Sequence, residues 1–128
     1  MSRGSKSLLL ADLFAALADP TRLRLLNLMA GNEVCVCHFV EILGQSQPKI
    51  SRHLAYLRRT GLVAARREGK WMHYRICASA GGAVDSILAA VLAALGRDQQ
   101  MQAERAKLDP ACCARESEST PTRDKAIQ

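Results

Sequence analysis

The sequence predicts a mainly α-helical domain that carries one small β-hairpin. Apolar residues recur at helical spacing over most of the chain, whereas a period-two alternation marks residues 71–76. Glycine and proline separate these segments at short intervals. At 128 residues the chain is long enough for one domain with a buried core, and too short for a large two-domain enzyme.

Two helices are predicted in the first quarter of the chain, after a polar N-terminal arm at residues 1–7. Dense apolar residues favour a helix over residues 7–18. Asp19 followed by Pro20 is typical of a helix start, because the aspartate accepts hydrogen bonds from backbone N–H groups and proline suits the first helical position. Gly31 is expected to end this second helix.

A pair of helices joined by a short turn is predicted next. A short extended connector at residues 32–34 leads to a third helix over residues 36–43. Ser46 can cap a fourth helix that runs to about Arg59. Spacing of i, i+4 and i+7 places its apolar residues on one face, which leaves a basic and polar face outside. The apolar face consists of Ile50, Leu54 and Leu57.

The hairpin and the last helix complete the predicted domain. Residues 62–67 and 70–76 are expected to form two strands around a Glu-Gly turn. Apolar residues over 84–95 fit a further helix, which we expect to continue as a polar helix over residues 97–108. The prediction is therefore one domain at residues 8–108, followed by a mobile, cysteine-containing tail at 109–128.

Positive charge is concentrated in one segment. The whole chain has a net charge of +6, yet residues 46–77 alone hold eight basic residues and one acidic residue, a net charge of +7. A nearly neutral body with one basic segment is typical of a protein that docks on a polyanion, although a solvated charged face is the plainer alternative. The 4% aromatic content disfavours single-stranded nucleic acid, which needs interleaved aromatic side chains.

This order of elements, with a capped basic helix followed by a basic hairpin, is that of a winged helix-turn-helix. The capped helix would enter the major groove of double-stranded DNA. Lysine and arginine would neutralise phosphates, while glutamine and arginine in the first turn could read base edges. His53 is expected to be structural or to face a phosphate. The candidate DNA contacts are Gln45, Ser46, Gln47, Lys49, Ser51, Arg52, His53, Tyr56, Arg58, Arg59, Arg66, Arg67 and Lys70.

Cysteines form the sharpest chemical feature. No secretory signal is visible, so we expect a cytoplasmic protein with reduced thiols. Cys35 and Cys37 are soft ligands suited to thiophilic ions, although two buried cysteines acting as small hydrophobic residues are the plainer alternative. On an ideal helix, residues i and i+2 point about 200° apart. Binding of one ion should therefore distort the first turn of the helix at 36–43 and re-aim the neighbouring basic helix.

Four stretches resemble the ArsR/SmtB family of metal-responsive repressors, and its arsenic-responsive branch in particular. They are residues 15–26, the basic helix at 47–63, the hairpin at 69–75 and the segment 33–37 with its two cysteines. The resemblance implies a homodimeric winged-helix repressor that binds operator DNA without a cofactor. It also implies release by As(III) or Sb(III), and dimerisation through the terminal helices. The candidate dimer residues are Leu13, Leu17, Val84, Ile87, Leu88, Val91, Leu92 and Leu95.

The chain departs from one pattern of that family, in which a third cysteine follows three residues after the second. Val40 stands there and cannot coordinate an ion. Cys112 and Cys113 are the next candidates, since trivalent arsenic takes three sulfurs; they could complete the site, form their own site or be incidental.

Alternatives to an arsenic-responsive repressor remain open at this stage. They are a redox or sulfide switch, a cadmium or lead sensor of the same fold, and a small thiol enzyme. The enzyme is disfavoured because the chain lacks a Cys-x-x-Cys motif in a βαβ pattern, a glycine-rich phosphate loop and a nucleophile elbow. No membrane association is expected.

Overall fold

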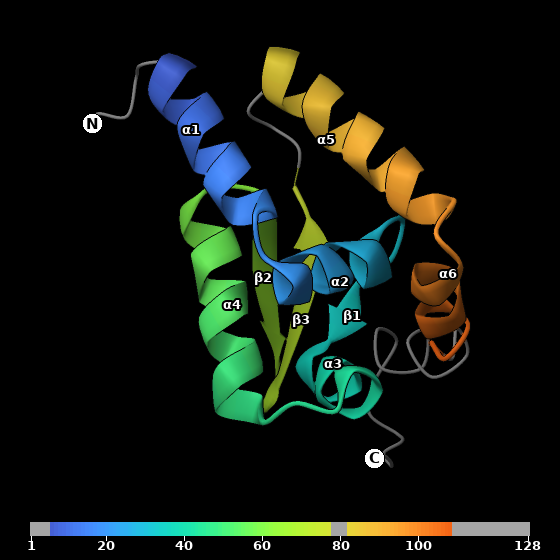
Figure 1. Cartoon of the computed structure of the whole chain (residues 1–128). Coiled ribbons are helices and arrows are strands. Elements are labelled where there is room, and N and C mark those ends of the chain that lie inside the picture. The colour runs from blue at the N-terminus through green and yellow to red at the C-terminus, as the bar shows by residue number, and fades with distance from the viewer. Residues whose placement is uncertain (1–5, 78–81, 109–128) are drawn as a thin grey trace.

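The computed structural model describes residues 6–77 and 82–108, except for the side chains of residues 6–9. Helices surround a small sheet in the winged helix-turn-helix arrangement that the sequence predicts (Figure 1). The elements are α1 (Lys6–Leu17), α2 (Pro20–Met29), β1 (Val34–Cys35), α3 (Val36–Leu43), α4 (Gln47–Arg59), β2 (Val63–Glu68), β3 (Trp71–Ile76), α5 (Gly82–Gly96) and α6 (Gln99–Arg105).

Polar caps begin the helices where the sequence predicts them. The Oδ1 atom of Asp19 accepts hydrogen bonds from the backbone N–H groups of Thr21 at 2.8 Å and Arg22 at 3.1 Å, which starts α2. Gly44 has a φ of +68°, a conformation that glycine adopts without strain, and it ends α3. Ser46 then caps α4, so the turn between α3 and α4 is short.

The sheet has three antiparallel strands in the order β1-β3-β2, one strand more than the predicted hairpin. The extra strand, β1, has only two residues and pairs with β3, so that Cys35 lies opposite His73. A segment this short shows no alternation, which is why its sequence predicts only an extended connector. The pairing joins the segment that holds the two cysteines directly to the hairpin.

One core holds the helices and the sheet together. The predicted apolar face of α4 is completely buried, and the core also takes in residues of every helix from α1 to α5. The fully buried residues of α4 are Ile50, Leu54 and Leu57. With that face inside, the basic face of α4 is turned outward.

The prediction that α5 continues without a break as a polar helix is wrong. Helix α5 ends at Gly96, and Asp98 caps a separate helix, α6, by accepting a hydrogen bond from the N–H of Met101 at 3.0 Å. Polar contacts hold α6 against α2: Arg24 donates to both carboxylate oxygens of Glu104, and Asn27 donates to the carbonyl of Met101 at 2.8 Å. These partners are distant in sequence, so helical periodicity alone cannot reveal the break.

The predicted tail at 109–128, with Cys112 and Cys113, lies outside the described residues, as does most of the predicted arm. Helix α1 begins at Lys6, two residues inside that arm. In the part of the chain that the structure describes, no helix is long and apolar enough to span a bilayer.

Candidate nucleic-acid interface and thiol site

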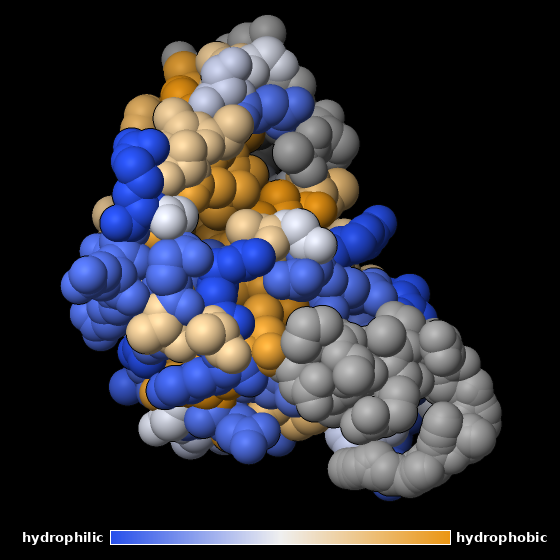
Figure 2. Space-filling model, turned by 90° about the vertical axis from the view of Figure 1, so that its right-hand side faces the viewer, coloured by the Kyte–Doolittle hydropathy of each residue, from blue (hydrophilic) through white to orange (hydrophobic). Residues whose placement is uncertain are grey.

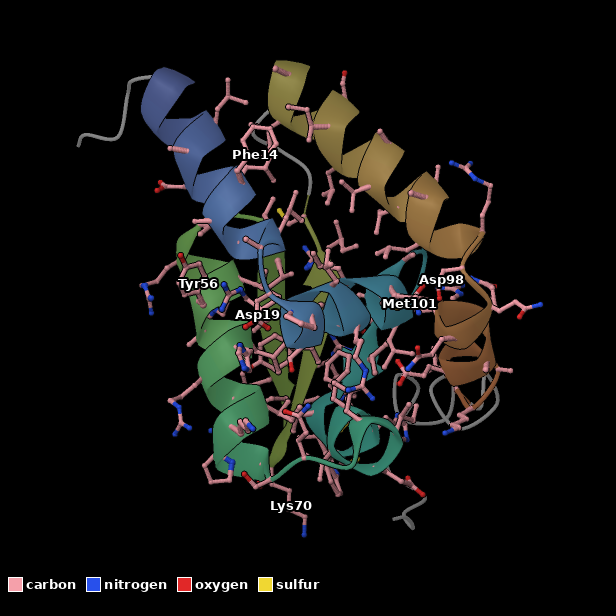
Figure 3. All side chains as sticks on the ribbon, viewed as in Figure 1. Phe14, Asp19, Tyr56, Lys70, Asp98 and Met101 are labelled. Carbon is pink, nitrogen blue, oxygen red and sulfur yellow. The ribbon has the colours of Figure 1, made fainter. Side chains whose placement is uncertain are left out.

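The outer face of α4 presents most of the predicted DNA contacts. Ser46 and five of the predicted contacts on the helix are exposed, and Ser51 and Tyr56 are half-buried. In Figure 3, Lys70 projects from the end of the molecule at which α4 begins, so the tip of the hairpin and the first turn of α4 lie toward the same end. Arg67 is exposed on the same hairpin. The exposed predicted contacts on the helix are Gln47, Lys49, Arg52, Arg58 and Arg59.

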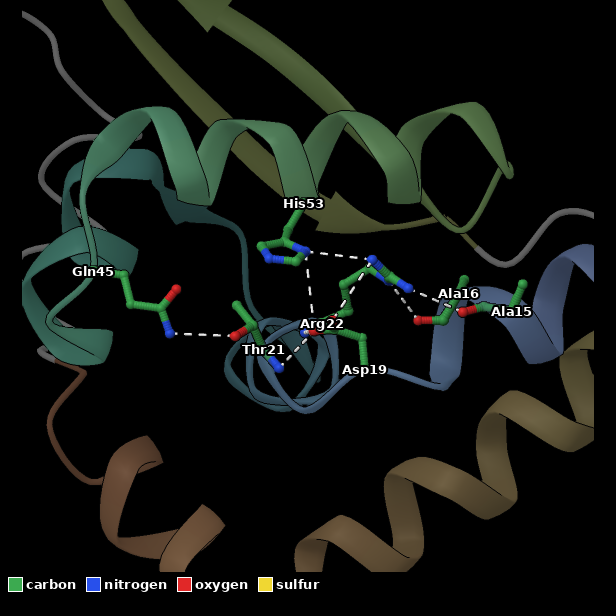
Figure 4. Close-up of polar contacts among 7 residues, drawn as sticks. All are labelled: Ala15, Ala16, Asp19, Thr21, Arg22, Gln45 and His53. Atoms are coloured by element: carbon green, nitrogen blue, oxygen red, sulfur yellow. Dashed lines mark hydrogen bonds and ion pairs between the residues drawn. The ribbon is translucent and has the colours of Figure 1, made fainter.

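Arg22 joins α1, α2 and α4 (Figure 4). Its guanidinium donates to the carbonyl of Ala16 at 2.8 Å and to that of Ala15 at 3.0 Å, at the C-terminal end of α1. A cation at that end of a helix satisfies carbonyls that lack helical partners. The same guanidinium lies 4.1 Å from the centre of the Tyr56 ring, and Arg59 lies 5.3 Å from it. These contacts fix the outer face of α4 relative to α1.

His53 faces the inside of this junction. Its Nδ1 atom lies 3.4 Å from Nη1 of Arg22 and 4.0 Å from a carboxylate oxygen of Asp19. Burial lowers the pKa of His53, and the nearby charge of Asp19 opposes this shift without cancelling it. The charges of Arg22, Lys49 and Arg52 also lower the pKa of His53. The ring is therefore mostly neutral near pH 7, and its contacts in the structure are those of a structural residue.

The pKa of Asp19 is lowered as well. Burial would raise the pKa of this carboxyl, but the N–H groups of Arg22 and Thr21 and the charges of His53 and Arg22 outweigh that effect.

Gln45 is turned toward α2 rather than outward. Its Nε2 atom donates to Oγ1 of Thr21 at 3.2 Å, and its Oε1 atom is buried without a hydrogen-bond partner. To read a base edge, the Gln45 side chain would have to break its hydrogen bond with Thr21. Among the predicted base contacts, Gln45 is therefore the residue that the structure supports least directly.

Arg66 is held by two carboxylates. It donates through Nε and Nη2 to Glu33, at 3.0 and 2.6 Å, and through Nη1 to Glu68 at 3.0 Å. The hydrogen bonds from Arg66 lower the pKa of Glu33, and those to the two carboxylates raise the pKa of Arg66 above its ordinary value. Its predicted role as a DNA contact therefore competes with this ion-pair network.

The thiols of Cys35 and Cys37 lie together, and the expectation that they diverge is wrong. Their sulfur atoms are 3.3 Å apart. Cys35 precedes α3 and has an extended backbone, with φ −74° and ψ 144°, so the angular separation of an ideal helix does not apply. Cys35 is buried and Cys37 is exposed, which leaves one sulfur open to solvent.

The spacing of the two sulfurs suits one shared ion. Metal–thiolate bonds of about 2.3 Å place two sulfurs on a single ion roughly 3 to 4 Å apart. Within residues 6–77 and 82–108, however, no three potential ligands among histidine, cysteine, aspartate and glutamate lie close enough to hold a metal ion.

An apolar surface covers parts of α1 and α5, where Figure 2 shows hydrophobic residues gathered in the upper half of the molecule. Phe14, which was not predicted for this surface, is 55% exposed and lies between the two helices in the view of Figure 3. The remaining predicted dimer residues on this surface are half-buried: Leu17, Ile87, Val91, Leu92 and Leu95.

Three of the predicted dimer residues belong to the core of the protomer instead. Leu13 and Leu88 are 2% exposed and Val84 is 8% exposed, all packed within their own chain. Periodicity identifies the apolar residues of α5 correctly. It cannot tell which of them face the chain's own core, because α5 is apolar nearly all round.

Comparison with known proteins decides the family. Residues 19–65 match the family described as "Bacterial regulatory protein, arsR family". The solution structure of a homodimeric winged helix-turn-helix DNA-binding domain from Mycobacterium bovis, a possible ArsR-family transcriptional regulator, is 33% identical with a TM-score of 0.59. The match covers 77% of this chain and 91% of that domain. The chain belongs to the ArsR family. Family members are regulators of transcription, so the thiol-enzyme alternative is excluded.

Curated ArsR relatives include proteins of arsenic resistance. The arsenical resistance operon repressor of Escherichia coli is 54% identical over 70 residues, which are 54% of this chain and 60% of that protein. An arsenic resistance transcriptional regulator of Pseudomonas putida is 46% identical over 80 residues, 62% of each chain. The matched segment thus spans about three fifths of these relatives.

Proposed function

We propose that this ArsR-family chain is a homodimeric repressor that leaves its operator when As(III) or Sb(III) binds Cys35 and Cys37. The observation that carries the proposal is the 3.3 Å separation of the two thiols at the start of α3, a helix that packs against α4. The names of the arsenic-resistance relatives support this choice of inducer.

DNA binding would use α4 and the hairpin. Exposed α4 would enter the major groove, where Gln47, Ser51 and Arg52 have the chemistry to contact base edges. Lys49, Arg58, Arg59, Arg67 and Lys70 would contact phosphates, which makes affinity fall steeply with salt. Two copies of the chain, joined through the apolar surface of α1 and α5, would place two α4 helices in successive turns of the groove.

Release follows from linkage between the two sites. Because Cys35 is buried, an ion that binds both sulfurs would have to enter a site closed to solvent, and we expect its entry to shift the start of α3. Helix α3 packs against α4, so a shift there changes the position of the DNA-binding face. An inducer that favours the DNA-free conformation lowers operator affinity, and DNA lowers inducer affinity by the same factor.

Cys112 or Cys113 is proposed to supply a third thiolate. Arg105 of α6 donates to the carbonyls of Asn27 at 2.7 Å and Ala30 at 2.9 Å, at the end of α2 that leads into β1. Leu108 packs on the core, and Cys112 follows it by four residues in the sequence. Helix α6 itself is thus held at the end of α2 that leads through β1 to the thiols.

The test is release of a labelled operator, selected from a random duplex library and followed by fluorescence anisotropy. We expect arsenite and antimonite to release the wild-type protein under reducing conditions. Cys35→Ser with Cys37→Ser should bind DNA normally and stay bound, while Cys77→Ser serves as the matched thiol control. Release of the double variant by arsenite would overturn the thiol site, and absence of sequence-specific binding would overturn the repressor.

The same assay separates the alternative inducers, because two adjacent thiols can also hold other soft ions or be oxidised. Release by cadmium or lead alone would identify a divalent ion, and not a metalloid, as the inducer. Release only by a mild oxidant would indicate a redox switch. Parallel assays of Cys112→Ser and Cys113→Ser test the tail: unchanged arsenite affinity in both would exclude the third thiolate.

A further inference from the structure

A row of side chains crosses the sheet from the thiol site to the hairpin. Cys35 of β1 lies opposite His73 of β3, and His73 lies opposite Arg66 of β2. Residues directly opposite each other in antiparallel strands project from the same face of a sheet. The buried thiol of Cys35 and the guanidinium of Arg66 therefore belong to one face, on either side of a buried histidine.

Glu33 links the segment that carries Cys35 to Arg66 at the other end of this row. It stands two residues before Cys35, and both its carboxylate oxygens accept hydrogen bonds from Arg66. Two parallel bonds between planar groups fix direction as well as distance. The segment from Glu33 to Cys37 is thus attached to the hairpin in two ways, by the backbone pairing of β1 and by this ion pair.

We propose that Glu33 is a positioning residue that transmits inducer binding from the thiols to the hairpin. The inference rests on the proposed function. A shift of the thiol segment would pull Arg66 with it and move the hairpin that carries Arg67 and Lys70. Inducer binding would then displace both parts of the DNA-binding surface, α4 through α3 and the hairpin through Arg66.

The contribution of this pair to folding stability is expected to be small, which makes its role in coupling testable. The side chains of Arg66 and Glu33 are 40% and 25% exposed, and partly exposed ion pairs stabilise proteins little. Glu68 offers a matched control. It also accepts a hydrogen bond from Arg66, but it lies on the hairpin itself and not on the thiol segment.

The experiment measures operator dissociation constants with and without saturating arsenite, and takes their ratio as the coupling factor. We expect Glu33→Gln to lower this ratio at least about fivefold, the lower end of typical coupling between sites. Glu68→Gln should keep it within about twofold. The charge-swapped variant, Glu33→Arg with Arg66→Glu, should restore much of the ratio even if its DNA affinity is reduced.

Arsenite affinity of the DNA-free proteins, followed by ultraviolet absorbance of the thiolate complex, controls for damage to the thiol site. We expect Glu33→Gln to match the wild type within about twofold in this measurement. An unchanged coupling factor in Glu33→Gln, with a wild type that arsenite releases, would overturn the positioning role alone. Equal losses in Glu33→Gln and Glu68→Gln would overturn it too, because they would trace the effect to the free charge of Arg66. A wild type that arsenite never releases would overturn the proposed function as well.

Discussion

Individual polar residues place the outer face of α4, and Arg22 and His53 are central among them. Arg22 binds the end of α1 and stacks on Tyr56, while His53 lies between Arg22 and Asp19. Arg22 lies within a stretch that carries the family resemblance, but its role could not be derived from the sequence. The role depends on carbonyls of α1 and a ring of α4 that only the fold brings to it.

His53 predicts a specific dependence of stability on pH. Its pKa in the folded protein is lowered from the ordinary value of 6.5, first of all by burial. Below pH 6.5 the unfolded state therefore binds more protons at this site than the folded state does. The free energy of unfolding consequently decreases as the pH is lowered from 6.5 to the folded-state pKa. His53→Gln removes this component. Urea unfolding at pH 7.5 and 5.5 should show a smaller loss for the variant, and equal losses would contradict the assignment.

Two arginines on the proposed DNA-binding surface should behave differently. Arg52→Ala is expected to reduce discrimination between operator and random DNA by about 1–3 kcal/mol, because it removes a proposed base contact. Arg67→Ala should weaken binding to both DNAs alike and lower the slope of affinity against salt by about one. Anisotropy titrations at several salt concentrations measure both quantities. Indistinguishable profiles for the two variants would refute the division of roles.

At the scale of elements, most helices and both hairpin strands could be predicted because their signals are local. The capping Asp19 identifies the start of α2, and the stripe of buried apolar residues identifies α4, without reference to the rest of the chain. Strand β1 could not be predicted, and apolar periodicity misses the break before α6 although Gly96 and the capping Asp98 mark it locally. Pairing with β3 defines the former, and contacts of Glu104 and Met101 with α2 fix the latter.

The thiol site divides in the same way between local and distant information. Its two cysteines are evident from composition and spacing, but their 3.3 Å approach depends on the extended backbone at Cys35. The link from Glu33 to Arg66 joins residues 33 positions apart, so no local pattern indicates it.

Among the contacts that dock α6 on α2, the Arg24–Glu104 ion pair should contribute measurably to stability. Glu104 is 7% exposed and accepts hydrogen bonds from Arg24 through both oxygens. Glu104→Gln is expected to lower the free energy of unfolding by about 1–3 kcal/mol, because Arg24 loses its charged partner in a poorly solvated site. Exposed Gln102→Ala is the control on the same helix. Hydrogen exchange should show loosening of α6 in the first variant only; unaltered protection would contradict the role of the pair.

For the whole molecule, we expect the apolar surface of α1 and α5 to form the proposed dimer interface. Phe14 is a large apolar residue exposed at 55%, on a surface continued by half-buried residues of α5 such as Val91. In a two-fold dimer each substitution occurs twice across the interface. Phe14→Glu should therefore raise the dimer dissociation constant at least about 30-fold, or about 2 kcal/mol, while the protomer remains folded.

Leu88→Glu should impair folding rather than dimerisation alone, since Leu88 is 2% exposed within its own protomer. A charge there is expected to destabilise the fold itself, because an unpaired charge cannot be accommodated in an apolar core. Sedimentation with circular dichroism separates the two outcomes: a folded monomer for Phe14→Glu and a partly unfolded chain for Leu88→Glu. Gln100→Glu, at an exposed position of α6, controls for added charge.

A folded monomer can contact only one half of a two-fold operator, so Phe14→Glu should also lose most operator affinity. A Phe14→Glu protein that remains dimeric would place the interface elsewhere.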